Sequence, residues 1–291
     1  MADYAQKWTT TFGPGEMAVA DTRRFEDGKF SVSAVPFRTS ADFSVFDHIK
    51  YFAASTRSFD VPRRGSITFT AEIDVKTPGT QPGRVIHGTY GPAGSYPSGA
   101  PYAASTFEGQ QAAATLHMID FATGQLFDWF VSGQRAFTLI ERLPSSLTGS
   151  PIPAGRDKIH TQIVDEVPIT PGPHQVAITL TRINGNLTVT YRLDGKKVSE
   201  VKDVGVPLDA QGVRFTGTYP SLGRGEKLVD QLNSVVIGHG LFSLLDAFPF
   251  HHAEAPELSV SIPQSERIFG QGAAAKFGKF TVETENLPVR D

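Results

Sequence analysis

The chain of 291 residues contains no cysteine. This absence excludes disulfides, thiolate nucleophiles and sites in which cysteine holds zinc or an iron–sulfur cluster. Several classes of enzyme are therefore removed before any motif is considered.

An excess of either charge is also missing. The chain has 27 Lys and Arg against 30 Asp and Glu, for a formal net charge of −3, and neither sign is gathered into long blocks. Nucleic acids and anionic membranes both favour clustered Lys and Arg. We therefore expect neither as a partner.

Long apolar runs are absent as well. The first residues lack a basic stretch followed by an apolar one, and no segment approaches the roughly 20 apolar residues that cross a bilayer. On these grounds we expect a cytoplasmic protein.

The clearest pattern present is an alternation of apolar and polar residues between Ser66 and Lys76. A strand with one face on a core shows this period of two, whereas a helix would scatter the apolar groups around its circumference. The side chains predicted to share the core face are Ile67, Phe69, Ala71, Ile73 and Val75.

A second alternating stretch, from His174 to Val201, predicts three consecutive strands. Its two turns fall at Asn184-Gly185 and Asp194-Gly195, the dipeptides that accept the positive φ angles of tight hairpins. This stretch is the strongest local signal in the chain.

The remaining pattern consists of short strands separated by turns. With 40% hydrophobic residues, it predicts an all-β fold: a two-sheet antiparallel β-sandwich of the jelly-roll type, with at most short helices. We expect a single domain over residues 1–291 with loop insertions at about 88–102 and 249–272. The other predicted strands are Gln6–Phe12, Lys29–Val35, Ala112–Asp120, Gln125–Val131, Arg135–Glu141, Gly212–Thr216, Ser234–Ile237 and Phe277–Thr284, with a helical turn at Leu241–Phe248.

The run His174–Ile178, followed by Leu187–Val198 with its Asp194-Gly195 hairpin, resembles the concanavalin A-like lectin and glucanase sandwiches. Gly65–Glu72 and Phe277–Thr284 resemble the framing strands of that superfamily. The resemblance covers the fold rather than one particular family.

One departure limits what this resemblance implies. Retaining glucanases need two carboxyl groups about 5 Å apart, whereas the adjacent Asp165 and Glu166 would point to opposite faces of a strand. The resemblance therefore implies the fold and only faintly sugar chemistry.

A candidate acid–base pair lies in the meander from Ala112 to Glu141. With turns of four residues (Phe121–Gly124) and three residues (Ser132–Gln134), His117 is opposite Asp128, and Thr138, a candidate for substrate binding, is beside them. A carboxylate that holds a histidine fixes its tautomer for acid–base work. The alternative is a cross-strand polar pair on a solvated face. The same register predicts a core face made of Leu116, Met118, Phe127, Trp129, Phe137 and Leu139.

Three tyrosines in the glycine-rich and proline-rich first insertion are candidates for ligand binding: Tyr90, Tyr96 and Tyr102. Tyrosine offers an apolar face for stacking and a polar tip. The alternative is that the loop forms only ordered turns.

The remaining motifs do not indicate a metal-binding, phosphate-binding or catalytic site. His239, His251 and His252 lack the spacing of metal ligands, so we expect no metal and no cofactor. Glu141-Arg142, at a strand end, is interpreted as a surface ion pair. A phosphate loop and a Gly-x-Ser-x-Gly elbow are both absent.

Three hypotheses of function remain. The first is a small-molecule-binding sandwich that acts as a cofactor-independent enzyme of specialised metabolism and performs cyclisation, isomerisation or elimination on a largely apolar substrate, with His117 and Asp128 as the catalytic pair. The second is a carbohydrate-binding or glycan-processing protein, and the third is a non-catalytic protein-interaction domain. The sequence leaves the oligomeric state open.

Overall fold

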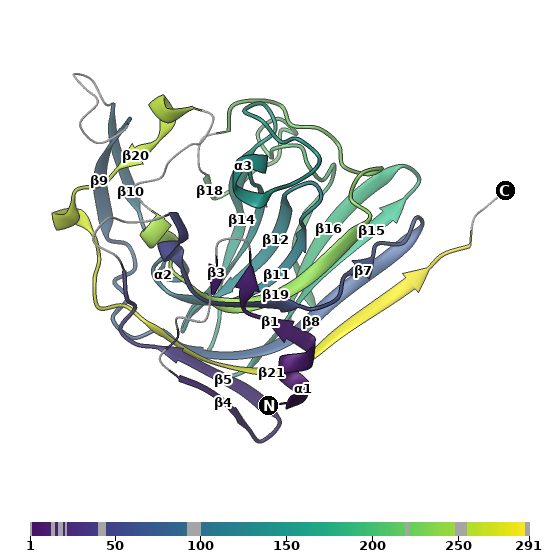
Figure 1. Ribbon diagram of the computed structural model, residues 1–291. Helices are drawn as coiled ribbons and strands as arrows, with labels where there is room; N and C mark the ends of the chain where they lie inside the picture. The colour runs from purple at the N-terminus through teal and green to yellow at the C-terminus, as the bar shows by residue number, and fades with distance from the viewer. Residues whose placement is uncertain are drawn as a thin grey trace.

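Two large antiparallel sheets face each other in the computed structural model (Figure 1). The structure describes residues 2–12, 15–16, 20, 22–39, 45–91, 100–218, 221–247 and 255–288. Within this part of the chain, no helix is long and apolar enough to span a membrane. The predicted all-β sandwich is confirmed by this arrangement.

The larger sheet has nine strands. Eight follow one another in the order β1-β6-β19-β11-β12-β13-β14-β18, and β7 pairs with β19 beside this path. Their bounds are β1 (Trp8–Thr9), β6 (Ile49–Ser55), β7 (Phe59–Asp60), β11 (Ala113–Asp120), β12 (Gln125–Val131), β13 (Arg135–Arg142), β14 (His160–Pro168), β18 (Gly217–Thr218) and β19 (Ser234–Phe242).

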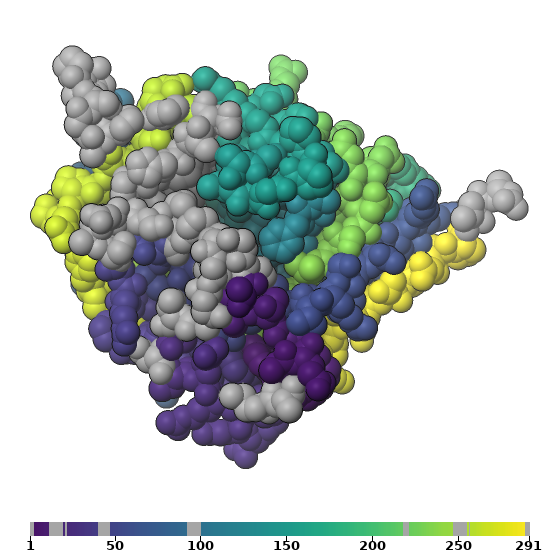
Figure 2. All heavy atoms as spheres, in the orientation of Figure 1, coloured from purple at the N-terminus to yellow at the C-terminus, as the bar shows by residue number. Residues whose placement is uncertain are grey.

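The second sheet has seven strands in the order β17-β16-β15-β8-β21-β5-β4. β21 pairs with β8 as far as Asn286, and its end projects from the body of the molecule (Figure 2). The bounds are β4 (Thr22–Glu26), β5 (Lys29–Ala34), β8 (Gly65–Lys76), β15 (His174–Ile183), β16 (Asn186–Leu193), β17 (Lys196–Val201) and β21 (Ala273–Asn286).

Small elements surround the two sheets. A three-stranded sheet, in the order β10-β9-β20, includes parts of both predicted insertions. The bounds of the small elements are α1 (Ala2–Lys7), β2 (Thr11–Phe12), β3 (Gly15–Glu16), η1 (Val45–His48), β9 (Val85–Tyr90), β10 (Pro101–Ser105), α2 (Glu108–Gln111), α3 (Ser145–Thr148), η2 (Leu244–Ala247), η3 (Pro256–Leu258), β20 (Val260–Ser261) and η4 (Gln264–Glu266).

The main core lies between the two large sheets. The predicted inward side chains of β8 are all buried there, and they alternate with partly exposed polar residues. Trp129 on β12 is fully buried, and its indole Nε1 donates a hydrogen bond to the backbone oxygen of Ala177 on β15, at 3.0 Å. The alternation thus directs one face of each sheet into a shared interior.

The predicted meander is also confirmed. β15, β16 and β17 pair in sequence, and the turn residues Asn184, Gly185, Asp194 and Gly195 have φ angles of 52°, 75°, 49° and 77°. Positive φ at both central residues belongs to the type I′ hairpin, whose twist matches that of the strands.

Other boundaries differ from the prediction. Residues 2–7, partly predicted as strand, form α1, and Gly212–Thr216 forms no strand. The structure adds β6 and β14, which the prediction lacked. β6 has five consecutive buried residues, because the larger sheet is covered on both faces, and such strands lose the alternation that marks them in a sequence.

Four residues, Ser132–Arg135, separate the first paired residues Val131 and Ala136, one more than predicted. Arg135, the first residue of β13, closes this turn through its backbone oxygen, which accepts hydrogen bonds from the backbone N–H and the hydroxyl of Ser132, both at 2.8 Å. Trp129 therefore lies opposite Thr138 instead of Phe137. A shift of one residue exchanges the two faces of a strand, so Phe137 and Leu139 do not share a face with Trp129 as predicted; both are buried instead in a second hydrophobic cluster on the outer face.

The sandwich predicts that substitutions on the two faces of β8 differ strongly in their effect on the unfolding free energy. Phe69→Ala removes a fully buried ring and should lower the free energy of unfolding by about 3–5 kcal/mol. Thr70→Ala, one residue on and directed away from the core, should cost less than about 1 kcal/mol. Urea unfolding of both variants measures the difference, and equal costs would contradict the assigned faces.

Candidate functional site

A line of polar side chains crosses the outer face of the nine-stranded sheet, the face that points away from the seven-stranded sheet. It contains His117 on β11, Asp128 on β12, Glu141 on β13 and Thr161 on β14. His117 lies directly opposite Asp128, and Glu141 directly opposite Thr161. Asp128 lies opposite Leu139, two residues from Glu141, so the two carboxyl groups are diagonal neighbours.

The predicted pairing of His117 with Asp128 is confirmed. His117 Nδ1 lies 2.7 Å from Asp128 Oδ1, and His117 Nε2 lies 2.6 Å from the hydroxyl of Thr115. The solvated-face alternative is wrong, because His117 is 3% and Asp128 1% exposed. Phe52 and Phe242 contact the imidazole, with ring centroids 5.1 and 4.9 Å away.

Burial changes the acidity of both groups. It lowers the pKa of His117 to about 3 and raises the pKa of Asp128 well above its ordinary value. His117 is therefore neutral near pH 7. Because the aromatic cover keeps both side chains from solvent, a direct catalytic role for this pair stays a prediction.

Glu141 is the part of the polar line that solvent reaches. Its side chain is partly buried and accepts a hydrogen bond from the Thr161 hydroxyl at 2.9 Å. Burial, followed by the nearby Asp128 carboxyl, raises the pKa of Glu141 to about 8. At neutral pH its carboxyl is therefore largely protonated and suited to donate a proton.

The interpretation of Glu141-Arg142 as a surface ion pair is wrong. Adjacent strand residues point to opposite faces, and Arg142 is 1% exposed on the inner side. Its guanidinium Nε donates to the Thr123 oxygen at 3.0 Å, and it forms an ion pair with Glu226 at 2.9 Å. If the turn before β13 had been predicted with four residues instead of three, the register would have placed Glu141 on the same face as Asp128.

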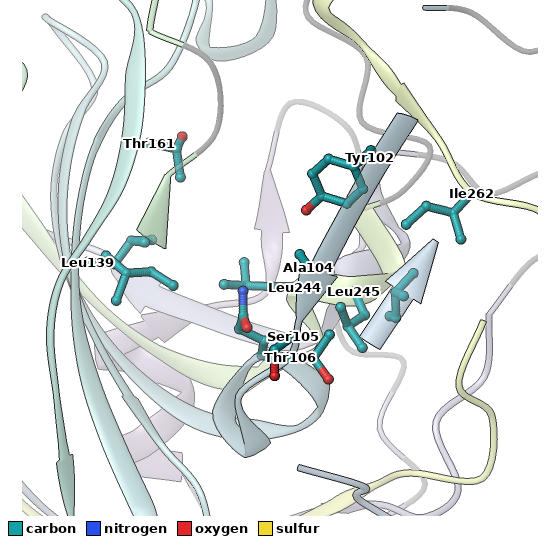
Figure 3. A pocket seen from close by; sticks show the side chains of 12 residues that line it. Tyr102, Ala104, Ser105, Thr106, Leu139, Thr161, Leu244, Leu245 and Ile262 are labelled. Carbon is teal, nitrogen blue, oxygen red and sulfur yellow. The ribbon is translucent and has the colours of Figure 1, made fainter. Parts of the chain in front are cut away.

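A cavity of about 40 Å³ lies between the outer face of the sheet and the three-stranded sheet; its lining includes Thr161, whose hydroxyl binds the Glu141 carboxyl, but not Glu141 itself. Figure 3 shows Leu139 and Thr161 on one side, and Tyr102, Ala104 and Ile262 on the other. The complete lining is Ile86, Tyr102, Ala104, Ser105, Thr106, Gln110, Leu139, Thr161, Ile163, Leu244, Leu245 and Ile262. None of these twelve residues is charged at neutral pH.

Tyr102 supplies a hydroxyl group to this cavity (Figure 3). Burial, with a smaller contribution from Tyr90, raises the pKa of Tyr102, so its hydroxyl stays protonated. Tyr90 packs edge-on against it, with ring centroids 5.7 Å apart, but does not line the cavity. The third predicted tyrosine, Tyr96, lies outside the described residues.

Thr138 does not belong to the site. The longer turn directs it into the sandwich, where it is fully buried and its hydroxyl lies 2.9 Å from that of Ser199 on β17. Its predicted contact with a ligand is therefore wrong.

Of the three histidines considered as metal ligands, one lies among the described residues. His239 is fully buried and lies 2.6 Å from the hydroxyl of Tyr4, while His251 and His252 fall outside the described residues. Within the described part of the chain, no group of three His, Asp or Glu side chains is placed to hold a metal ion.

A buried ion pair anchors one wall of the cavity. Asp246 in η2, next to the lining residue Leu245, lies 2.6 Å from Lys50 Nζ on β6, and both side chains are almost fully buried. Arg267 donates to the Leu245 oxygen at 3.2 Å. These contacts join three segments that are distant in the sequence.

Comparison with known proteins gives a family and a set of similar folds. The sequence matches a family described as a family of unknown function (DUF6081) over residues 10–286. No curated protein matches it. Solved structures similar to it are an alginate lyase from Pseudomonas aeruginosa (11% identity, 92% of this chain and 88% of that chain, TM-score 0.39), β-agarase B from Zobellia galactanivorans (9%, 97% and 87%, 0.40) and a legume lectin-like domain from Entamoeba histolytica (4%, 99% and 93%, 0.39). The likeness concerns the fold, as the resemblance in the sequence implied.

The raised pKa of Glu141 predicts a pH-dependent loss of stability. In the unfolded chain this group titrates near 4.5, and in the folded protein near 8. Its favourable contribution is complete below pH 4.5 and is lost as the pH rises to 8. Between pH 5 and 8, the wild type should lose about 2 kcal/mol more unfolding free energy than Glu141→Gln, after a discount for partial exposure. Urea unfolding across this range tests it, and parallel curves would contradict it.

The buried ion pair predicts a second effect on stability. Lys50→Met leaves Asp246 without its cation and should cost about 3–5 kcal/mol in unfolding free energy. A Lys50→Met, Asp246→Leu double variant should recover part of this loss, because both members of the pair are removed together, although the buried Arg267, 4.0 Å from Asp246, then loses its carboxylate. Lys197→Met, at an exposed lysine, serves as the control. A comparable loss of unfolding free energy in this variant would contradict the effect assigned to the buried pair.

Proposed function

Because the chain belongs to this family of unknown function, we propose from its own site that it is an acid–base enzyme acting on a neutral, hydroxyl-bearing substrate, with sugar units of a neutral glycan as the best-fitting class. The observation that carries this proposal is a protonated carboxyl, Glu141, that accepts a hydrogen bond from Thr161 in the lining of an uncharged cavity. A carboxylic acid of this kind can protonate a leaving oxygen at neutral pH.

The lining of the cavity favours a neutral ligand. An anionic sugar would lose its hydration there without meeting a cation, which costs several kcal/mol. Hydroxyl and carbonyl groups of a neutral ligand, by contrast, can pair with polar atoms of the lining. The uncharged polar side chains are Tyr102, Ser105, Thr106, Gln110 and Thr161.

In the proposed reaction Glu141 transfers its proton to the substrate oxygen that departs when its C–O bond breaks. The resulting carboxylate is stabilised by the Thr161 hydroxyl. The carbon that loses the oxygen then either binds the hydroxyl group of a water molecule or forms a double bond by losing a proton from the neighbouring carbon, and in each case the released proton returns to Glu141. Tyr102, which stays protonated, donates a hydrogen bond that orients the substrate. Proximity and one acid–base group supply the catalysis.

A second candidate function follows from the apolar half of the lining. Ile86, Leu139, Ile163, Leu244, Leu245 and Ile262 would suit a small, largely apolar metabolite that is cyclised, isomerised or dehydrated with the same acid. The cavity is small, so in either case it would hold one end of the substrate.

Ligand binding is tested by thermal shift and calorimetry with three probes: neutral oligosaccharides, uronate oligosaccharides and apolar alcohols. We expect neutral oligosaccharides to raise the melting temperature and uronates to have no effect, since a ligand selective for the folded state stabilises it. Ala104→Phe, which fills the cavity, should abolish the shift. Ala103→Phe is the matched control, because Ala103 is exposed on the same strand. A shift with apolar alcohols alone would favour the second candidate, and a shift that survives Ala104→Phe would exclude this cavity.

Catalysis is tested with Glu141→Gln on a substrate identified by that screen. Turnover should fall about 100-fold to 10,000-fold while the dissociation constant changes little, because the amide keeps its shape but donates no acidic proton. Glu283→Gln, on an exposed position of β21, is the control. Unchanged turnover in Glu141→Gln would remove Glu141 from the mechanism.

A further inference from the structure

Two carboxyl groups face the same side of the larger sheet on neighbouring strands. Asp128 on β12 is opposite Leu139 on β13, and Glu141 lies two residues further along the same face. Such diagonal neighbours are about 7–8 Å apart. At this separation, in a poorly solvated region, two negative charges would repel strongly, so the pair favours a state in which one of them stays protonated.

One of the two tautomers of His117 would place the charge on Asp128. A neutral imidazole has one N–H and one bare nitrogen. With the proton on Nδ1, His117 donates to Asp128 Oδ1 at 2.7 Å, and Nε2 accepts from the Thr115 hydroxyl at 2.6 Å. A donor aimed at the carboxyl of Asp128 stabilises its ionised form.

Water is kept away from this charge. Phe52, Phe130 and Phe242 surround the imidazole, with centroids 4.9–6.3 Å from it, and Asp128 is 1% exposed. Buried charges are screened far less than exposed ones. A charge on Asp128 therefore acts mainly on its neighbours in the sheet.

We propose that His117 and Asp128 are positioning residues: the hydrogen bond from His117 holds a negative charge on Asp128, and that charge keeps the acid proton on Glu141, where the cavity can use it. The inference rests on the proposed function in one respect, that Glu141 is the group that meets the substrate. It assigns to the buried His117 and Asp128 an electrostatic role instead of contact with the substrate.

The other groups around Glu141 do not account for this effect. From β14, the Thr161 hydroxyl stabilises the ionised form of Glu141. From the opposite sheet, Tyr191 donates to the Leu139 oxygen at 2.7 Å, and burial raises its pKa, so it is neutral. Tyr102, across the cavity, is neutral as well. After burial itself, Asp128 contributes most to the raised pKa of Glu141, although burial also raises the pKa of Asp128, so their protons leave in coupled steps.

Carbon-13 NMR of the side-chain carboxyls, without any ligand, tests the inference. The Glu141 resonance is assigned by its loss in Glu141→Gln. In Asp128→Asn the pH midpoint at which the Glu141 carboxyl titrates should fall by about one pH unit or more, since the neighbouring charge is gone. Asp120→Asn is the matched control, because Asp120 is a buried carboxyl of the same sheet that points into the sandwich and should leave the midpoint unchanged.

A pair of His117 variants separates the electrostatic role from a structural one. His117→Asn keeps an N–H near the position of Nδ1 and should preserve the high midpoint. His117→Leu removes the donor, so the proton moves to Asp128 and the midpoint of Glu141 falls. If Asp128→Asn does not fold, the two His117 variants still test whether the charge on Asp128 raises the titration midpoint of Glu141.

The outcomes are distinguishable. An unchanged Glu141 midpoint in Asp128→Asn or in His117→Leu would overturn the coupling, whether or not a substrate is found. An equal fall in His117→Asn and His117→Leu would also overturn it, because hydrogen-bond donation would then not matter. Shifts as expected, together with full turnover in Glu141→Gln, would retain the coupling and reject the proposed function.

Discussion

Burial of the larger sheet on both faces is the constraint on which the rest of the structure depends. One face of β11 and β12 packs on the main core, and the other lies under Phe52, Phe130, Phe242 and η2. Polar side chains on the covered face must therefore pair with one another instead of with water. His117, Asp128 and Thr115 do so, and the closely placed acidic groups lose the independence that they would have in solvent.

The sequence was informative wherever one face of a strand met the core and the other met water. The alternation in β8 and the Asn-Gly and Asp-Gly turns of the meander led to correct strands, because their signals are local. β6 was missed, since a strand with five consecutive buried residues carries a weaker period. β11 and β12 of the same sheet are as deeply buried, and they were predicted because turn residues separate them.

The candidate site was predicted only in part, and the reason is a single turn. The turn between β11 and β12 has the four residues expected, so His117 was correctly paired with Asp128. The turn before β13 holds Arg135 through Ser132, which no turn signature in the sequence indicated. That one residue moved Thr138 into the interior and Glu141 onto the outer face. The cover from η2 and the three-stranded sheet depends on long-range contacts, such as that of Lys50 with Asp246, which spacing along the chain does not show.

The four-residue turn at 132–135 also limits how genes encoding this fold can change. Loss of a single codon there would shift the register of β13 by one residue and exchange its two faces, so that the carboxyl group of Glu141 and the ring of Phe137 would point into the apolar interior between the two sheets. Insertions in the connections between β9 and β10 meet no such restriction, because no core strand takes its register from them. Variation in length among descendants of this sequence should therefore gather around the rim of the cavity and spare the hairpin that builds its floor.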